Sequence, residues 1–209
     1  LFGENYSDSP RFYLSIGDIY ERKGKNEEAL VYYEKARDIS SLYGPSHPSL
    51  RTAWESIGRI QTSLGLFDEA YESLTKSHEI LVGVSREKSL DIAKSHLNIG
   101  KLLKIQGKYN EALEHFTQAL EIAQAIEQLD SHFLSICYKE IGDCYLFLRK
   151  YDSSKDNYEK SLKIMIEHFG EDRSEVGALM TSLGSVEREL GHYGNAMENF
   201  QAALKIMKN

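Results

Sequence analysis

The sequence predicts an all-α solenoid of five antiparallel helix pairs, and three observations support this fold class. Five marker glycines, each preceded by an apolar residue, recur at spacings of 41, 42, 42 and 42 residues: Gly17, Gly58, Gly100, Gly142 and Gly184. A small residue follows each marker glycine after twelve residues, and a larger apolar one after sixteen, so that both lie on one helical face. In four copies another glycine, suited to a helix C-cap, comes seven residues after the marker. Self-similarity at this period predicts stacked two-helix units rather than one globular core.

The helices of each pair can be placed from these signals in chain order. The first helix begins at Ser9-Pro10, where serine can cap and proline is tolerated. We expect first helices at residues 9–23, 48–64, 89–106, 131–148 and 174–190. We expect second helices at residues 26–42, 67–83, 109–127, 151–168 and 193–208. The sequence therefore predicts a single array over residues 1–209 with repeats at 9–43, 48–84, 89–128, 131–169 and 174–209.

The turn inside each pair is marked by glycine at four places, Gly24, Gly65, Gly107 and Gly191. Arg149 stands at the corresponding position of the fourth pair. Because an L side chain is disfavoured in the left-handed conformation, this turn is expected to be strained or differently shaped.

The two ends of the chain resemble the interior of an array. The opening Leu1-Phe2-Gly3-Glu4-Asn5 is similar to the later linker His168-Phe169-Gly170-Glu171-Asp172, so residues 1–8 are expected to be the remnant of a preceding linker. In the last helix, Leu204 and Ile206 have no following helix to cover them. Since solenoids need polar caps, we expect a piece of a longer array that associates end to end.

Several segments carry a family resemblance: Trp54-x-x-Ile57-Gly58, Ile16-Gly17-x-x-Tyr20, Ile141-Gly142-x-x-Tyr145 and Ala112-x-x-x-Phe116. They resemble the tetratricopeptide repeat. The long period, together with Gly44-Pro45-Ser46-His47-Pro48, is similar to the repeats of kinesin light chains and nephrocystin-type proteins. The resemblance implies a right-handed superhelix in which the first helices line a concave groove that binds proteins.

Composition and motifs exclude several classes of function. The chain has 25 Lys and Arg against 32 Asp and Glu, a formal net charge of -7, which argues against a nucleic-acid partner. No apolar run approaches the roughly 18 residues of a membrane span, and no signal-peptide pattern is present, so we expect a cytoplasmic protein without a membrane partner. The seven histidines show no H-E-x-x-H spacing, and neither a phosphate loop nor a G-x-S-x-G elbow occurs. The sequence therefore predicts no enzyme activity, cofactor or metal site.

The resemblance implies that the residues six and three before each marker glycine, and one and four after it, face the groove. These positions hold seven basic and four acidic residues, although the whole chain is acidic. Lys94, Lys101 and Lys104 surround Leu97 in the third repeat, and Lys101 and Lys104 are expected to face solvent. Such a basic strip favours an extended, acidic peptide ligand. The candidate groove residues are Arg59, Lys94, Leu97, Asn98, Lys101, Lys104, Lys139, Asp143 and Arg188.

Three alternatives to this binding site remain open at the level of sequence. Lysines are common on solvated helix faces, so the strip could be ordinary surface. The array could be a regulatory sensor arm that controls an attached NTPase or effector domain. It could also be a structural spacer whose convex face and ends make the contacts in a large assembly.

Overall fold

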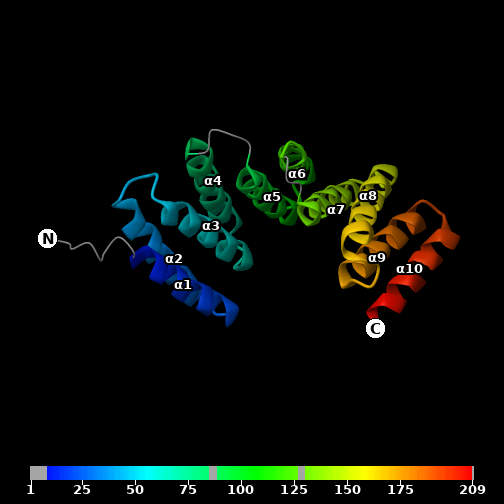
Figure 1. Ribbon diagram of the computed structural model, residues 1–209, viewed down its shortest axis with the longest axis horizontal. Helices are drawn as coiled ribbons and strands as arrows, with labels where there is room; N and C mark the ends of the chain where they lie inside the picture. Colours follow the sequence, from blue (N-terminus) through cyan, green and yellow to red (C-terminus); the bar gives the residue numbers. More distant parts are fainter. Residues whose placement is uncertain (1–8, 85–88, 127–129, 209) are drawn as a thin grey trace. The chain divides into compact units, whose positions relative to one another are not determined.

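The computed structural model describes residues 9–84, 89–126 and 130–208. Within these residues the chain forms ten helices and no strand (Figure 1). The helices are α1 (Ser9–Arg22), α2 (Asn26–Ser41), α3 (Pro48–Ser63), α4 (Phe67–Val84), α5 (Leu90–Ile105), α6 (Tyr109–Gln124), α7 (Ser131–Phe147), α8 (Tyr151–Phe169), α9 (Ser174–Glu189) and α10 (Tyr193–Met207). The predicted all-α class of successive helix pairs is confirmed.

Helix α6 shows the largest departure from the predicted bounds, because it ends at Gln124 instead of residue 127. The N–H of Ala125 is shared between the carbonyls of Glu121 and Ile122, which tightens the last turn and stops the helix. Residue 127 itself, and the predicted linker remnant at residues 1–8, lie outside the described residues.

The chain divides into two compact units, residues 1–102 and 103–209. In the first unit α1 packs on α2, α2 on α3 and α3 on α4. In the second unit the same succession links α6, α7, α8, α9 and α10. Within each unit, therefore, the packing runs between neighbours in sequence, as expected of a solenoid.

The marker glycines allow the two helices of a pair to approach closely. A Cβ added to Gly17 would lie 2.5 Å from the Tyr33 ring, and one added to Gly142 would lie 2.8 Å from the Tyr158 ring. Both tyrosines stand sixteen residues after their glycine, at the position of the larger apolar residue. In these two pairs the missing Cβ of the marker glycine therefore makes room for the tyrosine ring.

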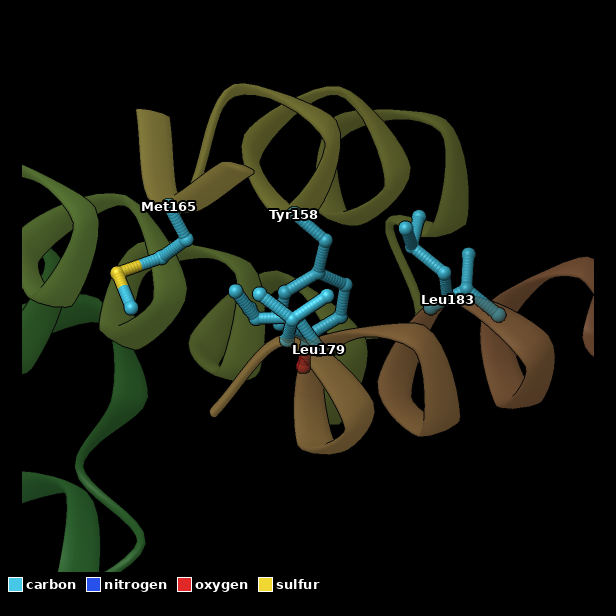
Figure 2. Packing of buried hydrophobic residues seen from close by; sticks show 6 residues of the cluster. Tyr158, Met165, Leu179 and Leu183 are labelled. Carbon is cyan, nitrogen blue, oxygen red and sulfur yellow. The ribbon is translucent and has the colours of Figure 1, made fainter. Parts of the chain in front are cut away.

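The same larger residue also reaches the next pair. Tyr158 of α8 is 1 % exposed and belongs to a cluster with Leu179 and Leu183 of α9 (Figure 2). Met165, one of the other α8 residues of this cluster, is likewise buried. The hydrophobic core of the second unit therefore lies between successive helix pairs.

The turn at Arg149 resolves the choice left open by the sequence. Arg149 has φ of 58°, close to the 71° of Gly24 and the 78° of Gly65. The following N–H, of Lys150, donates to the carbonyl of Tyr145 at 2.9 Å, as in the glycine-containing turns. The turn thus keeps the shape of the others, and its arginine occupies a strained left-handed conformation.

Helix α10 corrects one expectation about exposed apolar side chains. Ile206 was predicted to lie uncovered, but it is partly buried and packs on the core cluster of the second unit. Its methyl group comes within 3.5 Å of the position that a Cβ would take at Gly177 in α9. Leu204 is 53 % exposed, as predicted.

Candidate functional site

Open hollows lie between consecutive first helices in both units. In the first unit, a hollow of about 590 Å³ is lined from α1 by Arg11, Leu14 and Asp18 and from α3 by Thr52, among others. These four side chains stand at positions that the resemblance placed in the groove. Four of the eight predicted inward positions of the first two pairs therefore line one hollow, and Arg59 is not among them.

In the second unit, helices α7 and α9 carry three hollows along their length. The first, of about 120 Å³, has Ile136 and Ala178 in its wall. The second, of about 560 Å³, is lined by residues that include Lys104, and the third, of about 420 Å³, by residues that include Arg188. The second and third are adjacent, because Leu146 and two further residues line both.

Two of the predicted groove lysines in the second unit are already paired with carboxylates. The Nζ of Lys104 lies 2.5 Å from Glu140 Oε2 and 2.7 Å from Asp143 Oδ2. The Nζ of Lys139 lies 3.1 Å from the same Asp143 oxygen and 3.8 Å from Glu140 Oε1. The two lysines and two acids sum to no net charge, which weakens their attraction for an acidic ligand.

Lys104 was predicted to face solvent, and this expectation is wrong. Its side chain is only 19 % exposed. Burial opposes its charge, but Asp143 and Glu140 outweigh burial and raise the pKa of the ammonium group. Burial likewise opposes ionisation of Asp143, whose pKa is nevertheless lowered by Lys104, Lys139 and the Tyr158 hydroxyl. Both pKa shifts favour the charged forms of Lys104 and Asp143, which therefore hold each other as an ion pair.

Asp143 also anchors a buried tyrosine. Tyr158 Oη donates to Asp143 Oδ1 at 2.7 Å, and in the first pair Tyr33 Oη donates to Asp18 Oδ1 at the same distance. Burial, reinforced by these carboxylates, raises the pKa of both phenols. Tyrosine sixteen residues after the marker occurs only in these two repeats, and both have aspartate directly after the marker. This pairing is a sequence signal for the structural role of Asp143 that the groove argument missed.

The remaining candidates differ in what they offer to a ligand. Lys94 is exposed and Lys101 half-buried, and among the described residues neither takes part in an ion pair. Leu97 is 5 % exposed, so it is an interior residue and lines no open groove. Asn98 Nδ2 donates to Glu55 Oε1 at 3.2 Å and so joins α5 to α3.

Of the predicted groove residues that form ion pairs, the two arginines have the most exposed side chains. Arg59 is 51 % exposed and forms an ion pair with Glu21 across to α1. Arg188 is 58 % exposed and lies 3.3 Å from Glu189. Arg59 also donates to the hydroxyl of the buried Ser56, so of the two arginines Arg188 is the less constrained.

An exposed aromatic pair was missed by the sequence argument. Phe147, at the end of α7, is 57 % exposed, and its ring stacks on Tyr109 of α6 with centroids 4.8 Å apart. Both rings line the hollow of about 560 Å³. Phe147 follows its marker glycine by five residues, one beyond the last position that the resemblance assigned to the groove.

The tetratricopeptide repeat profile matches residues 8–82, 49–125, 91–167 and 133–209, which together cover nearly the whole chain. The chain belongs to the tetratricopeptide repeat family. Repeats of this family are typical of protein–protein interaction scaffolds, and the resemblance found in the sequence is confirmed. No curated protein matches the chain.

Solved structures of tetratricopeptide type share the fold at low identity. BtubC (BKLC) from P. vanneervenii has a TM-score of 0.85 at 19 % identity, over 97 % of this chain and 81 % of that one. A kinesin light chain-like protein of Podosopora anserina, with nearly identical TPR-like repeats, has a TM-score of 0.82 at 19 % identity over 98 % and 97 %. The apo form of RapI has a TM-score of 0.84 at 18 % identity over 96 % and 70 %. These likenesses support the solenoid architecture.

The described residues form neither a candidate metal centre nor a membrane-spanning helix. Residues 9–84, 89–126 and 130–208 contain no group of three or more side chains able to hold a metal ion. None of the helices in these ranges is long and apolar enough to cross a membrane. The absence of enzyme activity remains a prediction from the sequence.

Proposed function

We propose that this tetratricopeptide array is a protein-interaction module that captures an extended, acidic segment of a partner along its first helices. The observation that carries the proposal is the placement of the hollows. In each unit they open between consecutive first helices, at the positions expected to face the ligand. An extended chain can follow such a row of hollows and use many shallow contacts.

The acidic preference rests on two lysines without an ion pair in the described residues and on two arginines with exposed side chains. Lys94 and Lys101 of α5 supply charge without an ion pair in the described residues, and Arg59 and Arg188 are more than half exposed. Lys104, by contrast, is neutralised by its own acids and contributes mainly to stability. Exposed charges of this kind steer association and act over a Debye length of about 8 Å at physiological ionic strength.

We also propose that the five repeats form one continuous array and that the protein acts in the cytoplasm. A spacer role with end-to-end association is the second candidate, because α10 exposes Leu204 and Met207 at 53 % and 61 %. Capture of an acidic segment is favoured over this role because the hollows follow the predicted ligand positions in both units.

The test is a charge reversal on α5 with a matched control. We expect the Lys94→Glu/Lys101→Glu variant to bind an Asp- and Glu-rich extended peptide roughly tenfold more weakly, about 1.4 kcal/mol. The control, Lys163→Glu/Lys205→Glu, makes the same change in net charge on second helices, where Lys163 is 75 % exposed. Trp54, the single tryptophan, packs on the core of the first unit, so its fluorescence checks that unit's folding.

Two results would count against the proposal. The first is equal affinity of the α5 variant and the control for the peptide. The second is an affinity for the acidic peptide that does not fall when salt is added. Either outcome would move the interaction surface away from the first helices.

A further inference from the structure

The smallest of the three hollows described in the second unit has the character of a side-chain pocket. Its volume is about 120 Å³, and it lies between α7, α8 and α9. Ile136 on α7 and Ala178 on α9 both stand six residues before a marker glycine, and so on the proposed ligand face. Met165 and Leu179, labelled in Figure 2, form part of its wall and are 3 % and 2 % exposed.

The pocket offers apolar surface and no free hydrogen-bonding group in its depth. Two serines line it, but the Ser135 and Ser161 hydroxyls lie 2.9 Å apart, and Ser161 Oγ donates to the Ser135 carbonyl at 2.8 Å. Both hydroxyls are therefore occupied by each other and by backbone. A hydrocarbon group in the pocket would displace no hydrogen bond of the protein.

The size of the pocket restricts what can enter. An apolar cavity of about 150 Å³ in a protein core holds benzene. A space of about 120 Å³ is smaller, and it suits a branched or straight chain of four heavy atoms. The indole ring of tryptophan or the acyl chain of a lipid is too large for this space.

The mouth of the pocket is polar. His132, Lys139 and Glu175 line it, and the Glu175 carboxylate accepts from the Ser174 hydroxyl at 3.0 Å. Lys139 is held by Asp143 at 3.1 Å, so its ammonium group is fixed at one side. A ligand that fits must therefore carry polar groups directly beside a short apolar group, as an amino-acid residue of a peptide does.

We propose that this pocket receives one aliphatic side chain, leucine, isoleucine, valine or methionine, from the extended segment bound along the first helices. The inference rests on the proposed function and adds a fixed specificity position to it. A leucine in the pocket buries three carbons that alanine lacks. Its replacement by alanine in the ligand should weaken binding roughly 10- to 100-fold, as expected for burial of that many methylene groups.

The test is selection from a displayed library of random peptides on the 209-residue chain and four variants, one of which is the Lys94→Glu/Lys101→Glu variant described above. Ala178→Leu fills the pocket from an exposed position of α9, and Ala178→Ser is the matched control that leaves it open. Ile136→Ala enlarges the pocket. We expect peptides retained by the wild type and by Ala178→Ser to share one aliphatic position. Ala178→Leu should lose that preference, and Ile136→Ala should shift it towards phenylalanine.

The outcomes separate this inference from the function on which it rests. Retained peptides that are acidic but share no aliphatic position would overturn the pocket and leave the groove proposal standing. An unchanged aliphatic preference in Ala178→Leu would also overturn the pocket. If the wild type retains no peptide, both proposals fail. Loss of the acidic preference in Lys94→Glu/Lys101→Glu, with the aliphatic position kept, would support both.

Discussion

Neutralising Lys104 should destabilise the second unit far more than the same change at the neighbouring Lys101. Lys104→Met keeps most of the side-chain volume but removes the ammonium group that lies 2.5 Å and 2.7 Å from two carboxylates. The side chains of Glu140 and Asp143 are only 10 % and 17 % exposed, and their negative charges would then lie close together with one positive charge fewer beside them. The expected effect is a loss of folding stability, because charges left buried without partners are costly.

The magnitude follows from the geometry of the cluster. Removing one partner of a buried ion pair costs about 3–5 kcal/mol, whereas an exposed pair contributes about 0–1 kcal/mol. The cluster is mostly buried, but the ammonium group of Lys139 remains 3.1 Å from Asp143 and still offsets part of the negative charge. We therefore expect a loss of about 2–3 kcal/mol for Lys104→Met. Lys101→Met should change stability by no more than about 0.5 kcal/mol.

Urea denaturation followed by far-ultraviolet circular dichroism measures both variants. A double-mutant cycle with Asp143→Asn should give a coupling energy of at least about 1 kcal/mol, because the two side chains share one network. Equal effects of Lys104→Met and Lys101→Met, or a coupling energy near zero, would refute the assignment of Lys104 to a buried structural cluster.

Three further predictions concern the second unit. Gly142→Ala should be less stable than Gly177→Ala by about 1–3 kcal/mol in chemical denaturation, because its Cβ would meet the Tyr158 ring at 2.8 Å whereas the nearest atom at Gly177 is 3.5 Å away. Arg149→Gly should raise the melting temperature, with a gain of about 1 kcal/mol in folding stability, because it removes the strain of an arginine in the left-handed conformation. A lower melting temperature would contradict this strain. Because the folded pKa of Asp143 is lowered, its contribution to stability is present above the ordinary aspartate pKa of 3.8 and is lost as pH falls through the folded value. Acid titration of unfolding should therefore be less steep for Asp143→Asn, and identical slopes would exclude this contribution.

The fold could be predicted from the sequence because the same residue pattern recurs in five repeats. A helix start or a turn glycine that is ambiguous in one copy is fixed by the others, so most helix bounds agree to within one residue. Even Arg149 could be assigned to a turn from its place in the repeat. Only its conformation, which the pattern does not determine, required the structure.

The candidate site was less predictable because charges pair between repeats. Lys104 and its partner Glu140 stand 36 residues apart, and Glu140 lies two residues before a marker glycine, outside the assumed groove positions. Whether a lysine is free or neutralised depends on such contacts, which the periodicity does not encode. Leu97 is a second example, because its position in the repeat did not tell whether its side chain faces the open groove or is buried in the protein.

Photo-cross-linking would test most directly whether the ligand follows the first helices. A peptide retained by the wild-type chain, carrying a photoreactive group in its middle, would be cross-linked and the modified residues identified by mass spectrometry. The account predicts cross-links on the first helices, α1, α3, α5, α7 and α9, at side chains that line the hollows. Cross-links confined to the second helices, α2, α4, α6, α8 and α10, or to the linkers between repeats would contradict it.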